Sequence, residues 1–190
     1  MPINGFRVDL PDWMGAFERR LPECLPEAEA RMAAAISLSD QNARHDTGGP
    51  FGALVVRIED GQVIALGVNR VEPQQCSSAH AEIVAMSMAQ RRLGHWNLAA
   101  ASIGPLQLVT SCEPCAMCLG AIPWSGVKSV LCGALTADAE AAGFDEGVRP
   151  SDWIEVLARR GIDVRTAVLR EPAARVLERY ARTGGSIYNP

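Results

Sequence analysis

Two short motifs with metal-binding side chains constrain the fold of this chain more than any other feature. Residues 80–82 read His-Ala-Glu at the start of an apolar-periodic run, and residues 114–118 read Pro-Cys-Ala-Met-Cys. Residues two apart on a helix point in nearly opposite directions, so His80 and Glu82 converge only if a helix begins near Ala79 and directs its first turn at one point. The two cysteines lie three apart on one face, after a proline suited to a first helical position. The fold must therefore bring two helix N-termini together.

The two motifs supply the parts of a hydrolytic zinc centre. His80, Cys115 and Cys118 are three ligands of the kind that catalytic zinc takes, which leaves the fourth tetrahedral position to water. Zinc lowers the pKa of its bound water towards about 7, so that hydroxide exists at neutral pH. Glu82 as a fourth ligand would close the site, and we therefore expect it to shuttle protons between the attacking water and the substrate.

Simpler interpretations of these residues account for less. A Cys-x-x-Cys pair alone is typical of a redox site or of half a structural zinc site. A structural zinc site, however, normally has four protein ligands and no spare acid beside one of them. The non-enzymatic alternative is an inactive, zinc-stabilised interaction module. Such a module has no need of Glu82.

Length and charge set the class of protein. The chain has 190 residues, enough for one domain with a core. Its net charge is −4 and its arginines are scattered, so we expect no nucleic-acid partner. The N-terminus has no apolar leader and no apolar run is long enough for a membrane span. We expect a cytoplasmic protein with reduced cysteines and no membrane partner.

Hydrophobic periodicity predicts alternating strands and helices. We expect helices at residues 25–44, 79–93, 114–124, 151–160 and 172–182, with a short helix near Ala137. Strands are expected at residues 51–58, 63–69, 106–110, 128–132 and 162–169, the first two as a hairpin. This order predicts an α/β fold, a mixed sheet with helices on both faces. We expect residues 1–24 to form a surface arm, 25–182 the zinc-dependent domain and 183–190 a C-terminal tail.

The layout and motifs together resemble the cytidine-deaminase-like superfamily, and within it the guanine deaminases. H-x-E followed by P-C-x-x-C is the signature of zinc nucleobase deaminases. Further matching segments are residues 48–53 (GGPFGA), Asn69, 110–122 (TSCEPCAMCLGAI), Trp124, 140–146 (EAAGFDE) and 187–189 (IYN). The resemblance implies a three-layer α-β-α fold with a central five-stranded mixed sheet. It also implies a homodimer whose C-terminal tail can be exchanged onto the partner's active site.

The resemblance also implies roles for individual residues. It assigns zinc to His80, Cys115 and Cys118 and proton transfer to Glu82. Glu146 corresponds to a second active-site acid, although some relatives carry Asp at this place. The remaining residues would contact the substrate: Asn69 and the Ala81 backbone by hydrogen bonds, Phe51, His80 and Trp124 as walls, and Tyr188 as a cover from the tail.

The second acid favours guanine as the substrate. Guanine presents two adjacent donors, N1–H and the 2-amine, beside the C2 atom that the zinc-bound hydroxide would attack. An ionised carboxylate accepts from two donors at once, whereas cytosine and adenine place a donor beside a bare ring acceptor. Glu146 therefore suits guanine, and it could also assist the departure of ammonia. Amino-triazines such as ammeline share this edge and stay open as substrates, with cytosine and tRNA adenosine as further alternatives.

Overall fold

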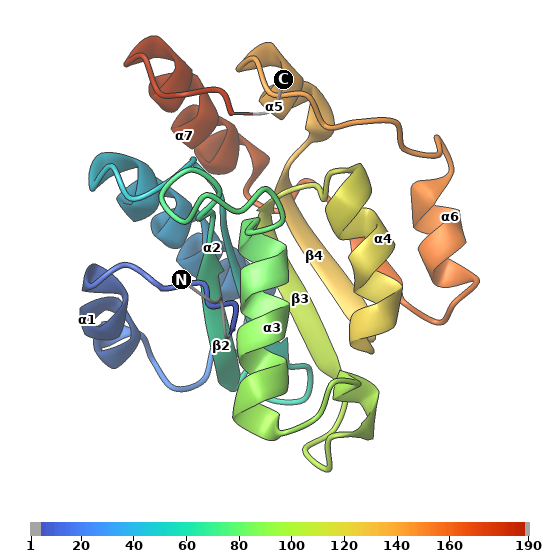
Figure 1. The fold of residues 1–190 in the computed structure, drawn as a ribbon. Helices are drawn as coiled ribbons and strands as arrows, with labels where there is room; N and C mark the ends of the chain where they lie inside the picture. Colours follow the sequence, from blue (N-terminus) through green and yellow to red (C-terminus); the bar gives the residue numbers. More distant parts are fainter. Residues whose placement is uncertain (1–4, 189–190) are drawn as a thin grey trace.

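Strand β1 (Gly52–Arg57) is apolar on both faces, which places it inside a sheet covered on both sides. Ala53 and Val55 are fully buried in one core cluster, and Leu54 and Val56 are fully buried in another. The computed structural model describes residues 5–188. Figure 1 shows the resulting arrangement of sheet and helices.

The sheet has five strands in the order β2-β1-β3-β4-β5. β1 pairs antiparallel with β2 and β3, whereas β3–β4 and β4–β5 are parallel, which makes the sheet mixed as predicted. The remaining strands are β2 (Val63–Val68), β3 (Leu106–Cys112), β4 (Ser129–Ala134) and β5 (Asp163–Arg165). The helices are α1 (Trp13–Arg20), α2 (Ala28–Arg44), α3 (Ala81–Leu93), α4 (Ala116–Ser125), α5 (Thr136–Ala141), α6 (Trp153–Ala158) and α7 (Arg170–Arg182), with a 3₁₀ turn at Leu98–Ala100.

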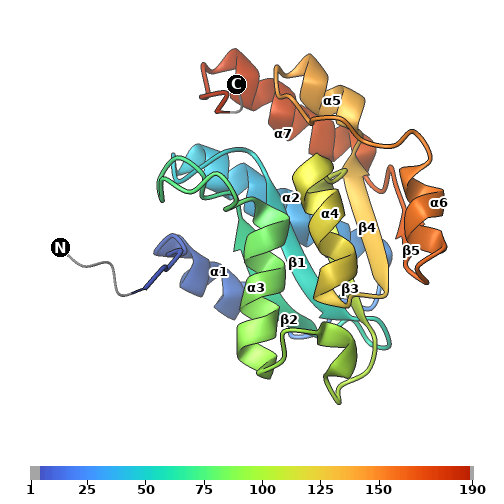
Figure 2. The same ribbon diagram turned by 45° about the vertical axis from the view of Figure 1, so that its right-hand side comes forward.

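The helices form two layers around the sheet, which confirms the predicted α/β class with a central five-stranded mixed sheet (Figure 2). Helices α3, α4 and α6 contribute buried side chains to the core on one face. Helices α1 and α2 pack on the other face, where α7 contacts β4 and α2. No helix among the described residues is long and apolar enough to cross a membrane.

Helix α3 lies unusually close to β2, because β2 carries a glycine where the two elements meet. A Cβ atom at Gly67 would lie 2.4 Å from the Ala81 carbonyl oxygen and 2.4 Å from the Ala85 nitrogen, both of which are backbone atoms. Neither can move without moving the helix. The glycine therefore fixes the position of the N-terminus of α3, where His80 and Glu82 lie.

Replacing Gly67 with alanine is expected to lower the free energy of unfolding by about 1–3 kcal/mol, because the added methyl group overpacks a backbone contact. The matched control is Gly120→Ala on α4, where nothing lies within 4 Å of the added Cβ. This change is expected to stabilise the helix by about 0.5–1 kcal/mol. Urea unfolding of both variants measures the difference, and equal stability of Gly67→Ala and the parent contradicts the expectation.

Several expected element boundaries differ from the structure. The N-terminal arm is more than a surface segment, because Met14 and Phe17 of α1 are buried in the core beside α2. The last strand is shorter than residues 162–169, because Ala167 and Leu169 have φ values of 59° and 50°, which no extended strand accommodates. Helices α3 and α4 each begin two residues later than predicted. Residue 189 of the tail motif lies outside the described residues.

Candidate active site

Two helix N-termini meet at one end of the sheet and bring three metal-binding side chains together. His80 and Cys115 are the N-cap residues of α3 and α4, and Cys118 lies in the first turn of α4. Their ligand atoms all lie within 4.8 Å of one another, and the Cys115 Sγ atom is 3.5 Å from His80 Nδ1. The convergence predicted from the sequence is thus present, with the first ligand of each motif at the cap and not inside the helix.

The donor set fits a zinc ion. Bonds of about 2.0–2.3 Å in a tetrahedron place neighbouring ligand atoms about 3.5 Å apart, in line with the spacing between His80 and Cys115. Hydrogen bonding from Cys118 lowers the pKa of the Cys115 thiol to about 4, against the opposing effect of burial. The thiolate is the form that binds metal.

Two carboxyl groups face the cavity beside these ligands. Glu82 lies in the first turn of α3 and Glu146 in the segment after α5, and each is only 7% exposed. Burial, together with the negative charge of Cys115, raises the pKa of Glu82 to about 7 and that of Glu146 to about 8. Two acids with pKa values near neutrality in one cavity are typical of acid–base chemistry.

Asn69, the residue after β2, presents its amide nitrogen to the cavity. Its Oδ1 atom accepts hydrogen bonds from the backbone N–H groups of Gly49 (3.3 Å) and Val71 (3.2 Å). The Nδ2 atom therefore points into the cavity, where it donates to the Tyr188 hydroxyl at 2.7 Å. The site thus offers a hydrogen-bond donor to a ligand at this position.

Aromatic side chains enclose the remaining space. Phe51 and Phe144 meet edge to face with ring centroids 4.9 Å apart, and the ring of Tyr188, from the C-terminal segment of the same chain, lies 5.5 Å from that of Phe144. The enclosed volume is about 20 Å³, enough for one water molecule. Sequence reasoning gave no site role to Phe144, although this residue lies within the matching segment 140–146, and none to Glu113. Both line the cavity.

The sequence also matches a known protein family. A model described as the cytidine and deoxycytidylate deaminase zinc-binding region matches residues 26–134. This range contains both motifs and the first four strands of the sheet. The chain belongs to this family.

The deaminase is similar in sequence and in structure to guanine deaminases. Guanine deaminase from Bacillus subtilis (strain 168) is 42% identical over 118 residues, which cover 62% of this chain and 71% of the relative. The structure of a guanine deaminase from Nitrosomonas europaea is 43% identical with a TM-score of 0.90, and the match covers 96% of this chain and 99% of that one. A related structure in complex with 8-azaguanine is 44% identical with a TM-score of 0.90, covering 94% and 98% of the two chains.

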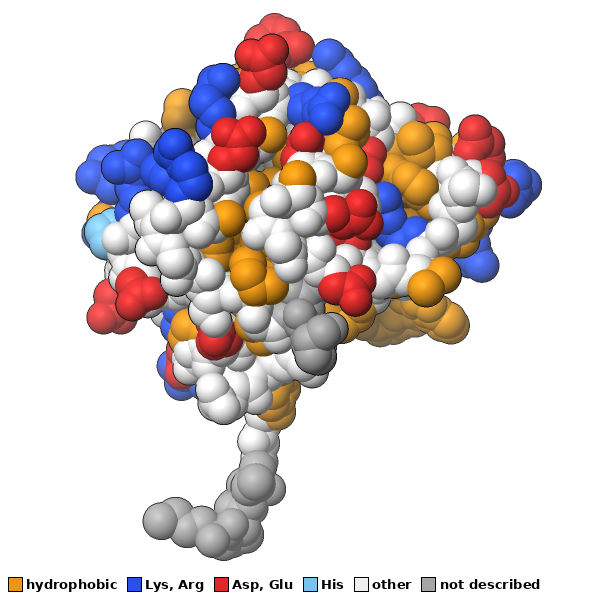
Figure 3. All heavy atoms as spheres, turned by 90° about the horizontal axis from the view of Figure 1, so that it is seen from above, with side chains coloured by type: hydrophobic (Ala, Val, Ile, Leu, Met, Phe, Trp, Pro, Cys, Tyr) orange, Lys and Arg blue, Asp and Glu red, His pale blue; other side chains and the backbone are white. Residues whose placement is uncertain are grey.

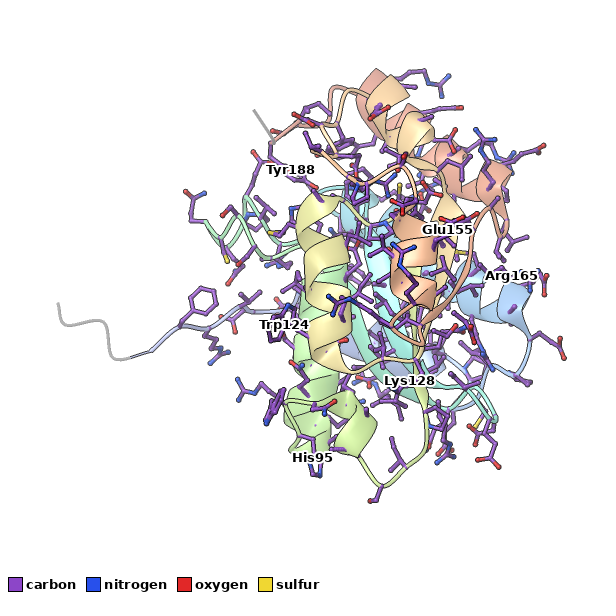
Figure 4. The ribbon with its side chains drawn as sticks, turned by 90° about the vertical axis from the view of Figure 1, so that its right-hand side faces the viewer. His95, Trp124, Lys128, Glu155, Arg165 and Tyr188 are labelled. Atoms are coloured by element: carbon purple, nitrogen blue, oxygen red, sulfur yellow. The ribbon has the colours of Figure 1, made fainter. Side chains whose placement is uncertain are left out.

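Two residues predicted to contact the substrate of the deaminase do not line the cavity of the single chain. Trp124 does not line the cavity and is 79% exposed on α4. It is near the C-terminal end of that helix, about 12 Å along the axis from Ala116 at 1.5 Å per residue. Figure 4 shows Trp124 well separated from Tyr188. The Ala81 side chain is buried in the core and does not line the cavity, whereas the predicted contact is by the Ala81 backbone. Contacts of the Trp124 side chain and of the Ala81 backbone with a substrate stay predictions.

Proposed function

We propose that this deaminase hydrolyses guanine to xanthine and ammonia. The observation that carries the proposal is the pair of buried acids, Glu82 and Glu146, which line one cavity with the metal-binding group. The near full-length similarity to guanine deaminase of Nitrosomonas europaea supports the same substrate. The related structure with bound 8-azaguanine supports a purine-shaped ligand.

Each residue has a task in the proposed reaction. Zinc held by His80, Cys115 and Cys118 supplies Lewis-acid chemistry, which makes hydroxide available near neutral pH. Glu82 takes one proton from the attacking water and passes it to the ring nitrogen beside C2, and it then carries the remaining hydroxyl proton to the departing amine. A C–O bond forms at C2 and the C–N bond breaks, so that guanine and water give xanthine and ammonia.

The other side chains hold the ring. In its ionised form, Glu146 accepts hydrogen bonds from N1–H and the 2-amine, which fixes C2 at the reacting centre. Asn69 donates from Nδ2 to a ring nitrogen, the role for which the Gly49 and Val71 amides orient it. The aromatic rings of Phe51, Phe144 and Tyr188 provide apolar walls.

A transfer-RNA substrate is less well supported. The tRNA-specific adenosine deaminase of Bacillus subtilis is 37% identical over 94 residues, which cover 50% of this chain and 54% of that protein. The chain has a net charge of −4, and on the face in Figure 3 the basic side chains are interspersed with acidic ones. Binding of a polyanion requires a concentrated basic surface.

Ammonia release from a panel of substrates tests the proposal. We expect the largest kcat/KM for guanine among guanine, cytosine, adenosine and ammeline, with xanthine formed in equal amount to ammonia. Metal analysis of the same preparation is expected to give about one zinc per chain. A larger kcat/KM for ammeline or cytosine, or no ammonia from guanine, contradicts the assignment.

We also propose a homodimer. Trp124 on α4 is 79% exposed, and Val148 beside this helix is 96% exposed. Large apolar side chains that are exposed to solvent are typical of an interface. In the single chain Tyr188 already closes its own cavity, and exchange of the tail between subunits stays a prediction. Light scattering of the purified protein gives the number of chains per particle, and a monomer at micromolar concentration contradicts the proposal.

We further propose that the protein acts in the cytoplasm, in the breakdown of purines. All six cysteines are unpaired, and thiolate metal ligands persist best in a reducing compartment. Cell fractionation tests the location, and recovery of the protein outside the cytoplasmic fraction contradicts it.

A further inference from the structure

The segment that carries Glu146 has no regular secondary structure. Residues 144–150 lie between α5 and α6 with neither helix nor strand hydrogen bonds, and in Figure 1 this segment crosses above the N-terminal end of α4. The position of the Glu146 carboxyl therefore depends on individual contacts. One contact is direct, since the Ala116 backbone N–H donates to the Glu146 carbonyl oxygen at 2.9 Å.

Arg149 makes the other contacts of this segment with the metal-binding loop. Its Nη1 atom donates to the Pro114 carbonyl oxygen at 2.9 Å, immediately before Cys115. Its Nη2 atom donates to the Glu113 carboxylate at 3.4 Å and to the Thr136 hydroxyl. One guanidinium group thus joins the segment of Glu146 to the end of β3 and to the start of α5.

These contacts are shielded from water. The side chains of Arg149 and Glu113 are only 12% and 11% exposed. Glu113 also accepts hydrogen bonds from the Thr136 backbone N–H at 3.0 Å and hydroxyl at 2.8 Å. The guanidinium carbon of Arg149 lies 5.2 Å from the centre of the Trp153 ring. Through these contacts, the guanidinium group of Arg149 holds the Pro114 carbonyl and the Glu113 carboxylate in fixed positions relative to its own segment.

We infer that Arg149 is a positioning residue, which holds Glu146 in register with Cys115 and thereby aligns the second acid with the reacting centre. The Ala116–Glu146 hydrogen bond and the Arg149–Pro114 hydrogen bond lie on either side of Cys115, so the segment is attached at two points. Arg149 does not line the cavity, and it acts through Glu146. The inference rests on the proposed function.

Hydrogen exchange tests the positioning role without any need for activity. In Arg149→Met, we expect amide exchange within residues 143–150 to become about tenfold faster, because the segment opens locally. Exchange in α3 and the zinc content are expected to equal those of the parent. Unchanged exchange in residues 143–150, or loss of zinc, overturns the inference. The control is Arg159→Met, whose arginine makes one exposed ion pair with Asp152.

A double-mutant cycle tests whether Arg149 acts through Glu146. We expect Arg149→Met to lower kcat/KM on guanine by about 10- to 100-fold, since small misplacements of a reacting group have effects of this size. In a Glu146→Gln background the same change is expected to lower it by less than about threefold. A purely structural role gives the same factor in both backgrounds and overturns the inference. Absence of guanine deamination in the unmodified chain contradicts the proposed function alone, because the exchange result stands independently.

Lysine at this position separates charge from geometry. Arg149→Lys keeps the positive charge and loses the fork that reaches the Pro114 carbonyl and Glu113 together. We expect it to recover less than about a third of the loss in log kcat/KM caused by Arg149→Met. Full recovery by lysine shows that charge alone suffices and overturns the positioning role.

Discussion

Replacing Glu82 with alanine is expected to abolish ammonia release from guanine, with a loss in kcat on the order of 10⁴. Glu82 lines the cavity beside the metal-binding group and is 7% exposed, and no other acid in the described residues lies in the first turn of α3. The zinc content is expected to remain about one per chain, because three other side chains supply the ligands. Single-turnover ammonia assays and metal analysis measure the two quantities.

Replacing Glu82 with glutamine tests whether the loss of activity comes from the missing carboxyl group or from a loss of stability. Glu82→Gln keeps the volume of the side chain and removes a carboxyl group whose burial raises its pKa to about 7. Burying an ionisable group is unfavourable, so the melting temperature is expected to stay the same or to rise. The control is Glu155→Ala on the exposed surface of α6 (Figure 4). Parent-like activity in Glu82→Ala removes Glu82 from the mechanism.

Replacing Glu146 with glutamine is expected to lower kcat on guanine by a factor on the order of 10²–10³ while zinc and fold are retained. A glutamine amide offers one acceptor and one donor group, and it cannot accept from N1–H and the 2-amine together. 2-Aminopurine has a bare acceptor at N1, so its loss of activity is expected to be smaller. The ratio of guanine to 2-aminopurine turnover therefore falls.

Steady-state kinetics on both purines measure this ratio. The matched control is Glu140→Gln on the exposed face of α5, six residues before Glu146 in the same region of the chain. It is expected to leave both rates unchanged. An unchanged ratio in Glu146→Gln, or near-normal turnover of guanine, shows that this carboxyl does not hold the substrate edge.

The metal-binding group could be predicted because its information is local. The cysteines are three positions apart, and His80 and Glu82 are two positions apart, so the start of a helix fixes each pair. The mixed sheet followed in the same way from apolar periods of two and of 3.6 residues. The helix starts were placed two residues early because a cap residue and a first helical residue leave the same pattern in sequence.

The remaining features depend on contacts between distant segments. The interaction of Arg149 with Glu113 and Pro114 joins segments that are separated by α4, β4 and α5, and nothing in the local sequence indicates it. The exposure of Trp124 could not be predicted, because family resemblance gives no information on which side of α4 a residue faces. The buried face of α1 was missed because a segment of eight residues is too short to show the helical period of apolar residues.

The hydrogen bond between Tyr188 and Asn69 gives the purine an intramolecular competitor. The tyrosine hydroxyl uses the donor that the ring nitrogen would take, and the volume left beside it admits a single water molecule. Only the fraction of molecules with this bond broken can receive guanine. Any dissociation constant determined on this chain is therefore the intrinsic constant divided by that fraction.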